Sequence, residues 1–188
     1  MQVKIYKNFL SKEECEVLNK VAIQGVNEGW IDKGVQDYKT GYDKRLTSRM
    51  HMGKAEYPQI VRDISTRVRK FVKVDLFPII DGHGKDGVVV SYTVQDGAVY
   101  KHKDPRSNDG LPTYRCNILT QANEDGCNLY VDGQKIDIEV GDLHCYLVSE
   151  LQHYVTEAKG ETPRIMWMFG AHIPKEHWSE YGLSRVNT

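Results

Sequence analysis

The stretch GVVVSYTV, residues 87–94, decides the fold, because the chain changes character there. It is a short apolar run rich in valine that ends at the turn signal QDG, which predicts a β-strand. The same pattern then repeats to residue 173. The further strand-like runs are YRCNILTQA, CNLYV, KIDIEV, LHCYLVS, YVTEA and RIMWMFGAHI. Seven or eight short strands separated by turns predict a jelly-roll barrel or sandwich over about residues 86–173.

Two helical patterns stand out in the first part of the chain, at about residues 1–80. Ser11 with Glu14 forms a capping-box signature, and an apolar stripe follows it. A second helix is expected from Pro58, a residue favoured in the first turn, through QIVRDISTRVRKFV. The expected apolar stripes are Cys15, Leu18, Val21 and Ala22 in the first helix, and Ile60, Ile64, Val68 and Phe71 in the second.

Length and composition favour one soluble domain that spans residues 1–188, of α+β class, with packing helices before a β-barrel core. The chain has 188 residues, of which 40% are hydrophobic and 27% charged. A formal net charge of -1 gives no general reason to expect binding to nucleic acid or a membrane surface. The polar N-terminus and the four scattered cysteines favour a reducing, cytoplasmic setting.

Four residues of the β-rich part point to chemistry. His102 and Asp104 lie one residue apart in YKHKDP; His153 follows in SELQHYV, and Arg164 in TPRIMWMF. Alone, the first two would be read as a solvated turn beside Pro105. Two imidazoles and one carboxylate, however, form the facial set that holds non-haem Fe(II) and leaves coordination positions open.

At these residues the chain resembles the Fe(II)/2-oxoglutarate-dependent dioxygenases, and within them the prolyl 4-hydroxylase-like branch. IYKNFLSKEECEVLNKVA, SYTVQDGAVYKHKDP and IEVGDLHCYLVSELQHYVTEAKGETPRIMWMF are similar to motifs of that branch, across most of residues 5–172. The resemblance implies a double-stranded β-helix core and His102, Asp104 and His153 as the iron ligands. It also implies Arg164 as the partner of the distal carboxylate of 2-oxoglutarate, a role that suits a planar guanidinium.

Further residues are candidates for the same site. Tyr92, ten residues before His102, is expected to donate a phenol hydrogen bond to that carboxylate, and Tyr100 and Thr120 are further candidates for cosubstrate binding. The long polar segment 30–53 reads either as a substrate lid or as a surface loop. The candidate substrate contacts in it are Trp30, Tyr38, Arg45 and Arg49.

Other polar residues have simpler readings. His144 is the rival of His153, but it lies within an apolar run and is expected to be a packed strand histidine. His172 and His177 lack a carboxylate or cysteine that would complete a metal site. Cys127 and Cys145 are expected to be small strand residues.

The implied activity is hydroxylation of a substrate C–H bond, with a prolyl residue of a protein or peptide as the leading substrate and succinate and CO2 as products. The implied cofactors and cosubstrates are Fe(II), 2-oxoglutarate and O2, and ascorbate is a further candidate cofactor. Nucleobase or free amino acid oxidation is the alternative, although RIMWMFGAHI lacks the second arginine usual in nucleobase oxidation. A non-catalytic jelly-roll binding module is the other alternative. No membrane partner is expected, and the sequence does not indicate an oligomeric state.

Overall fold

The computed structural model describes residues 3–33, 45–48, 57–80 and 87–183, and the side chains of 32–33 and 45–48 lie outside that description. A seven-stranded sheet forms the centre of the molecule, in the order β1-β10-β6-β13-β4-β3-β2. Its strands are β1 (Lys4–Tyr6), β10 (Leu143–Leu147), β6 (Thr113–Gln121), β13 (Arg164–His172), β4 (Val89–Thr93), β3 (Arg45–Ser48) and β2 (Ile31–Lys33).

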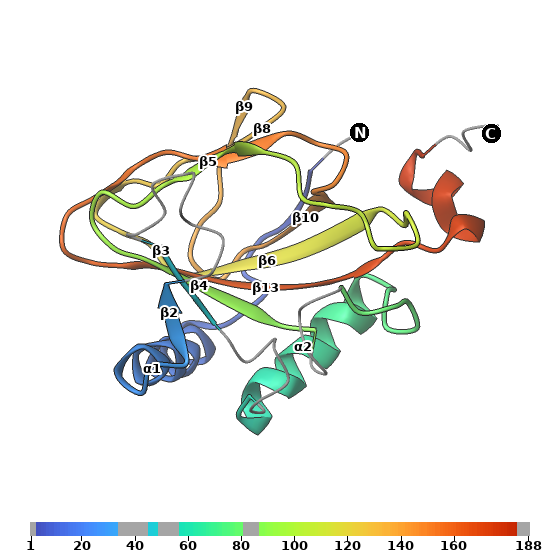
Figure 1. Cartoon of the computed structure of the whole chain (residues 1–188). Coiled ribbons are helices and arrows are strands. Elements are labelled where there is room, and N and C mark those ends of the chain that lie inside the picture. Colours follow the sequence, from blue (N-terminus) through green and yellow to red (C-terminus); the bar gives the residue numbers. More distant parts are fainter. Residues whose placement is uncertain (1–2, 34–44, 49–56, 81–86, 184–188) are drawn as a thin grey trace.

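A smaller, four-stranded sheet has the order β5-β11-β8-β9, and a two-stranded ribbon joins β12 to β7. All pairs are antiparallel. These strands are β5 (Val99–His102), β7 (Asp125–Gly126), β8 (Leu129–Val131), β9 (Gln134–Ile136), β11 (His153–Val155) and β12 (Ala158–Lys159). Figure 1 shows the four-stranded sheet on one side of the large sheet, so the predicted jelly-roll core is confirmed.

Two helices cover the other side of the large sheet (Figure 1). Helix α1 (Lys12–Asn27) contacts β6, and α2 (Gln59–Phe71) contacts β13. The predicted capping box is present, since the Ser11 hydroxyl accepts from the Glu14 amide and the Glu14 carboxylate accepts from the Ser11 amide. A 3-10 helix, η4 (Lys175–Tyr181), follows β13. Among the described residues, no helix combines the length and apolar character that crossing a bilayer requires.

The stripe predicted for the second helix is wrong at one end. Val61, Ile64 and Val68 are buried, whereas Phe71 is 50% exposed and lies edge-on to Tyr6. Ile60 packs against the core beside Val61, so the buried stripe begins as expected and ends one turn earlier.

The first 80 residues also contribute three strands, which the expected helical part did not include. Strand β1 pairs with β10 at one edge of the large sheet, while β2 and β3 extend the other edge beyond β4. These strands have three or four residues each, too short for an alternating pattern to be recognised in the sequence.

Because side chains alternate along a strand, the large sheet has two different faces. One, the helix face, carries Val90, Ile118, Leu143, Ile165 and Trp167, which belong to the main core with the helices. The other, the inner face, carries Val89, Ser91, Arg115, Asn117, Leu119, His144, Tyr146, Arg164, Met166 and Met168. Tyr146 packs there with residues of the smaller sheet, such as Val131 and Val155, so the inner face looks into the barrel.

Candidate metal and cosubstrate site

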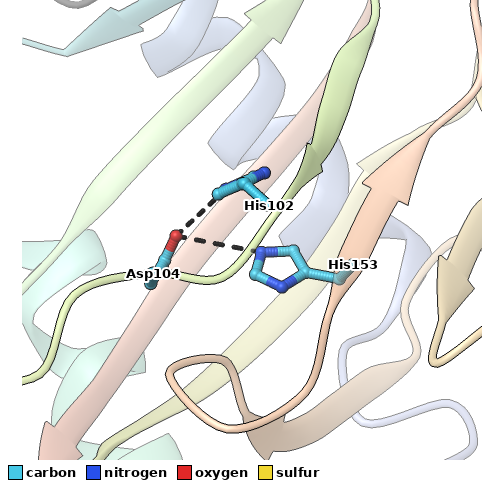
Figure 2. Close-up of side chains that lie close together, drawn as sticks. All are labelled: His102, Asp104 and His153. Carbon is cyan, nitrogen blue, oxygen red and sulfur yellow. Dashed lines mark hydrogen bonds and ion pairs between the residues drawn. The ribbon is translucent and has the colours of Figure 1, made fainter.

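Strand pairing brings the three expected metal ligands together. His102 ends β5, His153 begins β11, and the two residues are directly opposite each other in the antiparallel pair. Asp104 follows β5, where its amide donates to the Val148 carbonyl at 3.0 Å. One ligand atom from each of the three residues lies within 4.8 Å of the other two. Figure 2 shows both imidazoles next to the Asp104 carboxylate.

Backbone carbonyls orient both imidazoles. His102 Nδ1 lies 2.6 Å from the Tyr100 carbonyl oxygen, and His153 Nδ1 lies 3.1 Å from that of Leu151. A carbonyl oxygen only accepts, so in each neutral ring Nδ1 carries the proton and Nε2 keeps its lone pair. These Nε2 atoms lie 3.1 Å and 3.8 Å from Asp104 Oδ1. Neighbouring ligands held about 2.1 Å from a metal lie roughly 3 Å apart, so the donor set fits one divalent ion.

The charge states suit a metal. Burial lowers the pKa of His153 to about 4, which keeps its ring neutral near pH 7, the form that binds a metal. Burial alone would raise the pKa of Asp104. The charge of Arg115, with the close contact to His102 next, outweighs that effect and holds the pKa of Asp104 well below its usual range. The site therefore offers one carboxylate and, at His153, a neutral imidazole.

Arg115 is a site residue that the sequence reasoning missed. Its Nη2 lies 2.6 Å from Asp104 Oδ2, the oxygen turned away from the histidines, and its Nη1 donates to the Met168 sulfur at 3.2 Å. It therefore orients the carboxylate while leaving Oδ1 for a metal. The signal in the sequence was an arginine within the otherwise poorly charged strand YRCNILTQ.

Arg164 begins β13 and is 5% exposed. Its backbone pairs with that of Thr93, and its side chain lies on the inner face with Met166 and Met168. Its charge reaches the interior of the barrel. Burial and then the charge of Arg164 lower the pKa of His144, whereas burial raises the pKa of Cys127 and the charge of Arg164 opposes that rise. This guanidinium is thus placed on the same face as Arg115 and the ligand set.

Tyr92 does not lie where we expected, and the contacts of Thr120 do not test its expected role. Tyr92 pairs with Ile165 and packs against the helix-face core, on the opposite side of the sheet from Arg164. Thr120 lies at a register shift between β6 and β13; its hydroxyl donates to the Ile165 carbonyl at 3.4 Å, and its own carbonyl accepts from Asn19 of α1. We therefore withdraw Tyr92 as a cosubstrate residue, because its side chain packs toward the helices, whereas Thr120 stays a prediction.

Tyr100 contributes through its backbone, since its carbonyl orients His102 while the residue as a whole is 52% exposed. Of the substrate candidates, Trp30 lies on the helix side, where its ring meets that of Tyr57 edge-on at 5.8 Å, so we withdraw it too. Arg45 lies in β3 with its backbone paired to Thr93. Tyr38 and Arg49 lie outside the described residues.

No model of a known protein family matches the sequence, and no curated protein matches it either. Solved structures do match the fold. A viral collagen prolyl hydroxylase from Paramecium Bursaria Chlorella virus-1, in complex with 2-oxoglutarate, is 15% identical with a TM-score of 0.63; the match covers 90% of this chain and 95% of that one. A Pseudomonas putida prolyl-4-hydroxylase is 16% identical with a TM-score of 0.63, covering 90% and 92%.

Two more structures widen the comparison. A Trichoplax adhaerens prolyl hydroxylase, in complex with a peptide fragment of hypoxia inducible factor, is 13% identical with a TM-score of 0.67, covering 90% of this chain and 83% of that one. HygX from Streptomyces hygroscopicus, with nickel, 2-oxoglutarate and hygromycin B bound, is 12% identical with a TM-score of 0.62, covering 89% and 81%. The chain therefore has the double-stranded β-helix fold of prolyl hydroxylases and a related 2-oxoglutarate-binding protein.

Proposed function

We propose that the chain is an Fe(II)- and 2-oxoglutarate-dependent dioxygenase that hydroxylates a prolyl residue in a protein or peptide. The observation that carries this proposal is the convergence of His102, Asp104 and His153, each with a ligand atom within 4.8 Å of the others. Two histidines and one carboxylate form the facial set of non-haem Fe(II) oxygenases. The fold shared with prolyl hydroxylases supports the substrate class.

In this proposal each residue has a defined task. His102 and His153 bind Fe(II) through Nε2, and Asp104 binds it through Oδ1, while Arg115 holds the other carboxylate oxygen. Arg164 binds the distal carboxylate of 2-oxoglutarate inside the barrel, where burial strengthens a charge-assisted hydrogen bond. When bound, Fe(II) and 2-oxoglutarate supply the activation of O2, which converts the acid to succinate and CO2 and places the second oxygen atom on the substrate carbon. The barrel walls shield that chemistry from water.

The residues also bear on the alternatives. A binding module without catalysis needs neither a complete ligand set nor a buried arginine on the same face, yet both are present. The binding of hygromycin B by HygX indicates that this fold also accommodates non-peptide ligands, so a small molecule is the alternative substrate. All four cysteines are free and buried, which supports the expected cytoplasmic setting.

The test is turnover of 2-oxoglutarate with a panel of proline-containing peptides, each matched by a peptide with alanine in place of proline. We expect Fe(II)-dependent release of one succinate for each oxygen atom added to the proline peptide, as measured by mass spectrometry. His102→Ala is the inactive control, and His177→Ala, which changes a half-buried histidine paired with Glu180, is the matched active control.

Three results would count against the proposal. Succinate release that is equal in wild-type protein and His102→Ala would refute the enzyme class. Turnover with a free amino acid or an aminoglycoside, but with no proline peptide, would retain the class and refute the substrate. Oxygen added equally to the alanine-containing peptides would also refute the prolyl substrate.

A further inference from the structure

The inner face carries a buried histidine–asparagine pair whose role the proposed function leaves open. His144 on β10 and Asn117 on β6 are directly opposite each other in the antiparallel pair, so their side chains share one face. They are 1% and 5% exposed. Leu143, beside His144 on β10, is buried in the helix-face core, so the strand would remain anchored without a polar residue at 144.

The pair satisfies only part of its own hydrogen-bonding capacity. Asn117 Nδ2 lies 3.3 Å from His144 Nε2, but Asn117 Oδ1 and His144 Nδ1 have no hydrogen-bond partner among the residues that the structure describes. Buried polar atoms in native proteins are nearly always paired, and an unpaired one costs about 1–3 kcal/mol. Two unpaired atoms side by side point to a ligand that pairs them.

The chemistry of the pair indicates which ligand. If the amide nitrogen donates to His144 Nε2, then Nδ1 carries a proton that has no acceptor. If the amide is turned over, its nitrogen takes the unpaired position instead. Either arrangement presents one N–H without an acceptor and one lone pair without a donor. A carboxylate accepts from the first, and a guanidinium can donate to the second.

The charges around the His144–Asn117 pair also bear on the kind of ligand that it binds. Burial, followed by the nearby charge of Arg164, lowers the pKa of His144 to about 3, so the imidazole is neutral near pH 7 and contributes a dipole rather than a second positive charge. The charge of Arg164 also acts on the Cys127 thiol, which contacts the smaller-sheet core from the loop before β8. Arg164 thus supplies positive charge beside the unpaired atoms of His144 and Asn117, and this charge favours an anion as their ligand.

Ring contacts connect the pair to the candidate metal ligands. The Tyr146 ring is 5.5 Å from the His153 ring, and the His144 ring is 6.2 Å from that of Tyr146, nearly parallel to it. Asn117 is two residues from Arg115 on β6, on the same face. His144 and Asn117 therefore lie one step from the metal ligands, on the face that also carries Arg164.

We propose that His144 and Asn117, with Arg164, bind the distal carboxylate of 2-oxoglutarate and set the preference of the site for a dicarboxylic keto acid. This inference rests on the proposed function, because it assigns the partners of the same cosubstrate. It gives His144 and Asn117 the role that the sequence had suggested for Tyr92, whose side chain lies on the other face. Arg164 supplies the charge, while the pair supplies a fixed N–H and excludes keto acids with an apolar tail.

The test compares two keto acids that share the same metal-chelating end. Wild-type protein loaded anaerobically with Fe(II) is titrated with 2-oxoglutarate and with 2-oxopentanoate, which lacks the distal carboxylate. We expect His144→Phe and Asn117→Leu each to weaken 2-oxoglutarate binding by about 10- to 100-fold, the loss of a hydrogen bond to a charged group, and to leave 2-oxopentanoate binding unchanged or tighter. His144→Gln, which keeps an N–H donor, is expected to retain part of the affinity.

Asn19→Leu is the matched control, because Asn19 also has an unpaired buried amide oxygen but lies on α1 at the helix face. Its affinity for both keto acids should equal that of the wild type. Asn117→Leu is close in size to the native residue and removes an unpaired buried atom, so it keeps the measurement possible if His144→Phe does not fold. Thermal unfolding without ligand identifies the folded variants.

Each outcome is decisive. If wild-type protein binds no 2-oxoglutarate, the proposed function fails and this inference fails with it. If the wild type binds 2-oxoglutarate and both variants bind it equally well, the inference alone is wrong. If the variants weaken both keto acids by the same factor, the pair serves packing rather than carboxylate recognition, and the inference is again overturned.

Discussion

The two faces of the large sheet are built by the same strands but differ in the kind of side chain that they bury. On the helix face, β6, β10 and β13 present Ile118, Leu143 and Trp167, which are all fully buried against the helices. The neighbouring residues of the same strands, on the inner face, are Asn117, His144 and Met168. Asn117 Oδ1 and His144 Nδ1 have no hydrogen-bond partner among the described residues. These strands thus bury apolar side chains on the helix face and polar groups on the inner face. We therefore expect substitutions on the helix face to affect stability and substitutions on the inner face to affect ligand binding.

The helix face should show the largest effect of any substitution on folding. Trp167 is 0% exposed and its ring contacts that of Tyr57 at 5.8 Å. Trp167→Ala is expected to lower the free energy of unfolding by about 3–5 kcal/mol, because it leaves a large cavity. Urea unfolding followed by far-ultraviolet circular dichroism measures this. A loss below about 1 kcal/mol would contradict the view that this face carries the stability.

On the inner face, a substitution of Arg164 should affect ligand binding rather than folding. Arg164→Ala is expected to weaken 2-oxoglutarate binding by about 2–5 kcal/mol, as when one partner of a buried charge pair is removed. Arg164→Lys keeps the charge but loses the planar fork, so its affinity should lie in between. Calorimetric titration of the anaerobic Fe(II) protein measures both variants, and an unchanged affinity in Arg164→Ala would rule out the anchor role.

Arg115 should act on the metal rather than on the cosubstrate. Arg115→Gln removes the guanidinium that lies 2.6 Å from Asp104 Oδ2, so the carboxylate loses its fixed orientation. We expect a loss of about 10- to 100-fold in Fe(II) affinity, which is typical for a residue that supports a metal ligand. Competition with a chelator measures the affinity. Arg106→Gln, which breaks the surface pair of Arg106 with Glu150, is the matched control and should bind Fe(II) as wild type does.

Asp142 provides the smallest effect and a contrast with the unpaired atoms of the inner face. This carboxylate is fully buried but completely paired, because it accepts from Lys7 Nζ and from the amides of Asn8 and Glu139. Asp142→Asn should cost about 1–2 kcal/mol of stability near pH 7. It ties β1 to the turn before β10, so the loss should appear in unfolding and not in ligand binding.

The sign of its pH dependence follows from the shifted pKa. Burial would raise the pKa of Asp142, but the hydrogen bonds from Lys7, Glu139 and Asn8 outweigh it and lower that pKa. Its contribution is therefore complete above the unfolded-state pKa of about 3.9 and is lost as the pH falls through the lower, folded-state value. Urea unfolding of wild type and Asp142→Asn should differ at pH 7 and converge in acid. A difference that grows in acid would contradict this assignment.

Patterns local in sequence predicted much of this molecule. The capping box at Ser11, the run of short strands and the ligand set of His102, Asp104 and His153 depend on neighbouring residues or on a recognised spacing. The face on which a strand residue lies depends on its register, and a shift of one residue reverses it. This is why Tyr92 was assigned to the wrong face, and why Arg115 and Asn117, set among apolar neighbours, went unnoticed.

Other features depended on contacts between distant segments. Strand β1 exists because Lys4–Tyr6 meets Leu143–Cys145, a pairing that no local pattern of three residues encodes. His144 was correctly read as a buried strand histidine, but its unpaired Nδ1 becomes visible only once Asn117 is placed opposite it. The sequence thus pointed to the three residues that converge at the candidate site more readily than to the residues that support them.

The most direct test of the central claim is the absorption spectrum of the protein with Fe(II) and 2-oxoglutarate in the absence of O2. If His102, Asp104 and His153 hold one iron to which the keto acid chelates, the wild type should show a metal-to-ligand charge-transfer band that is absent in His102→Ala and present in His177→Ala. A band of equal strength in His102→Ala, or no band in the wild type, would contradict the account.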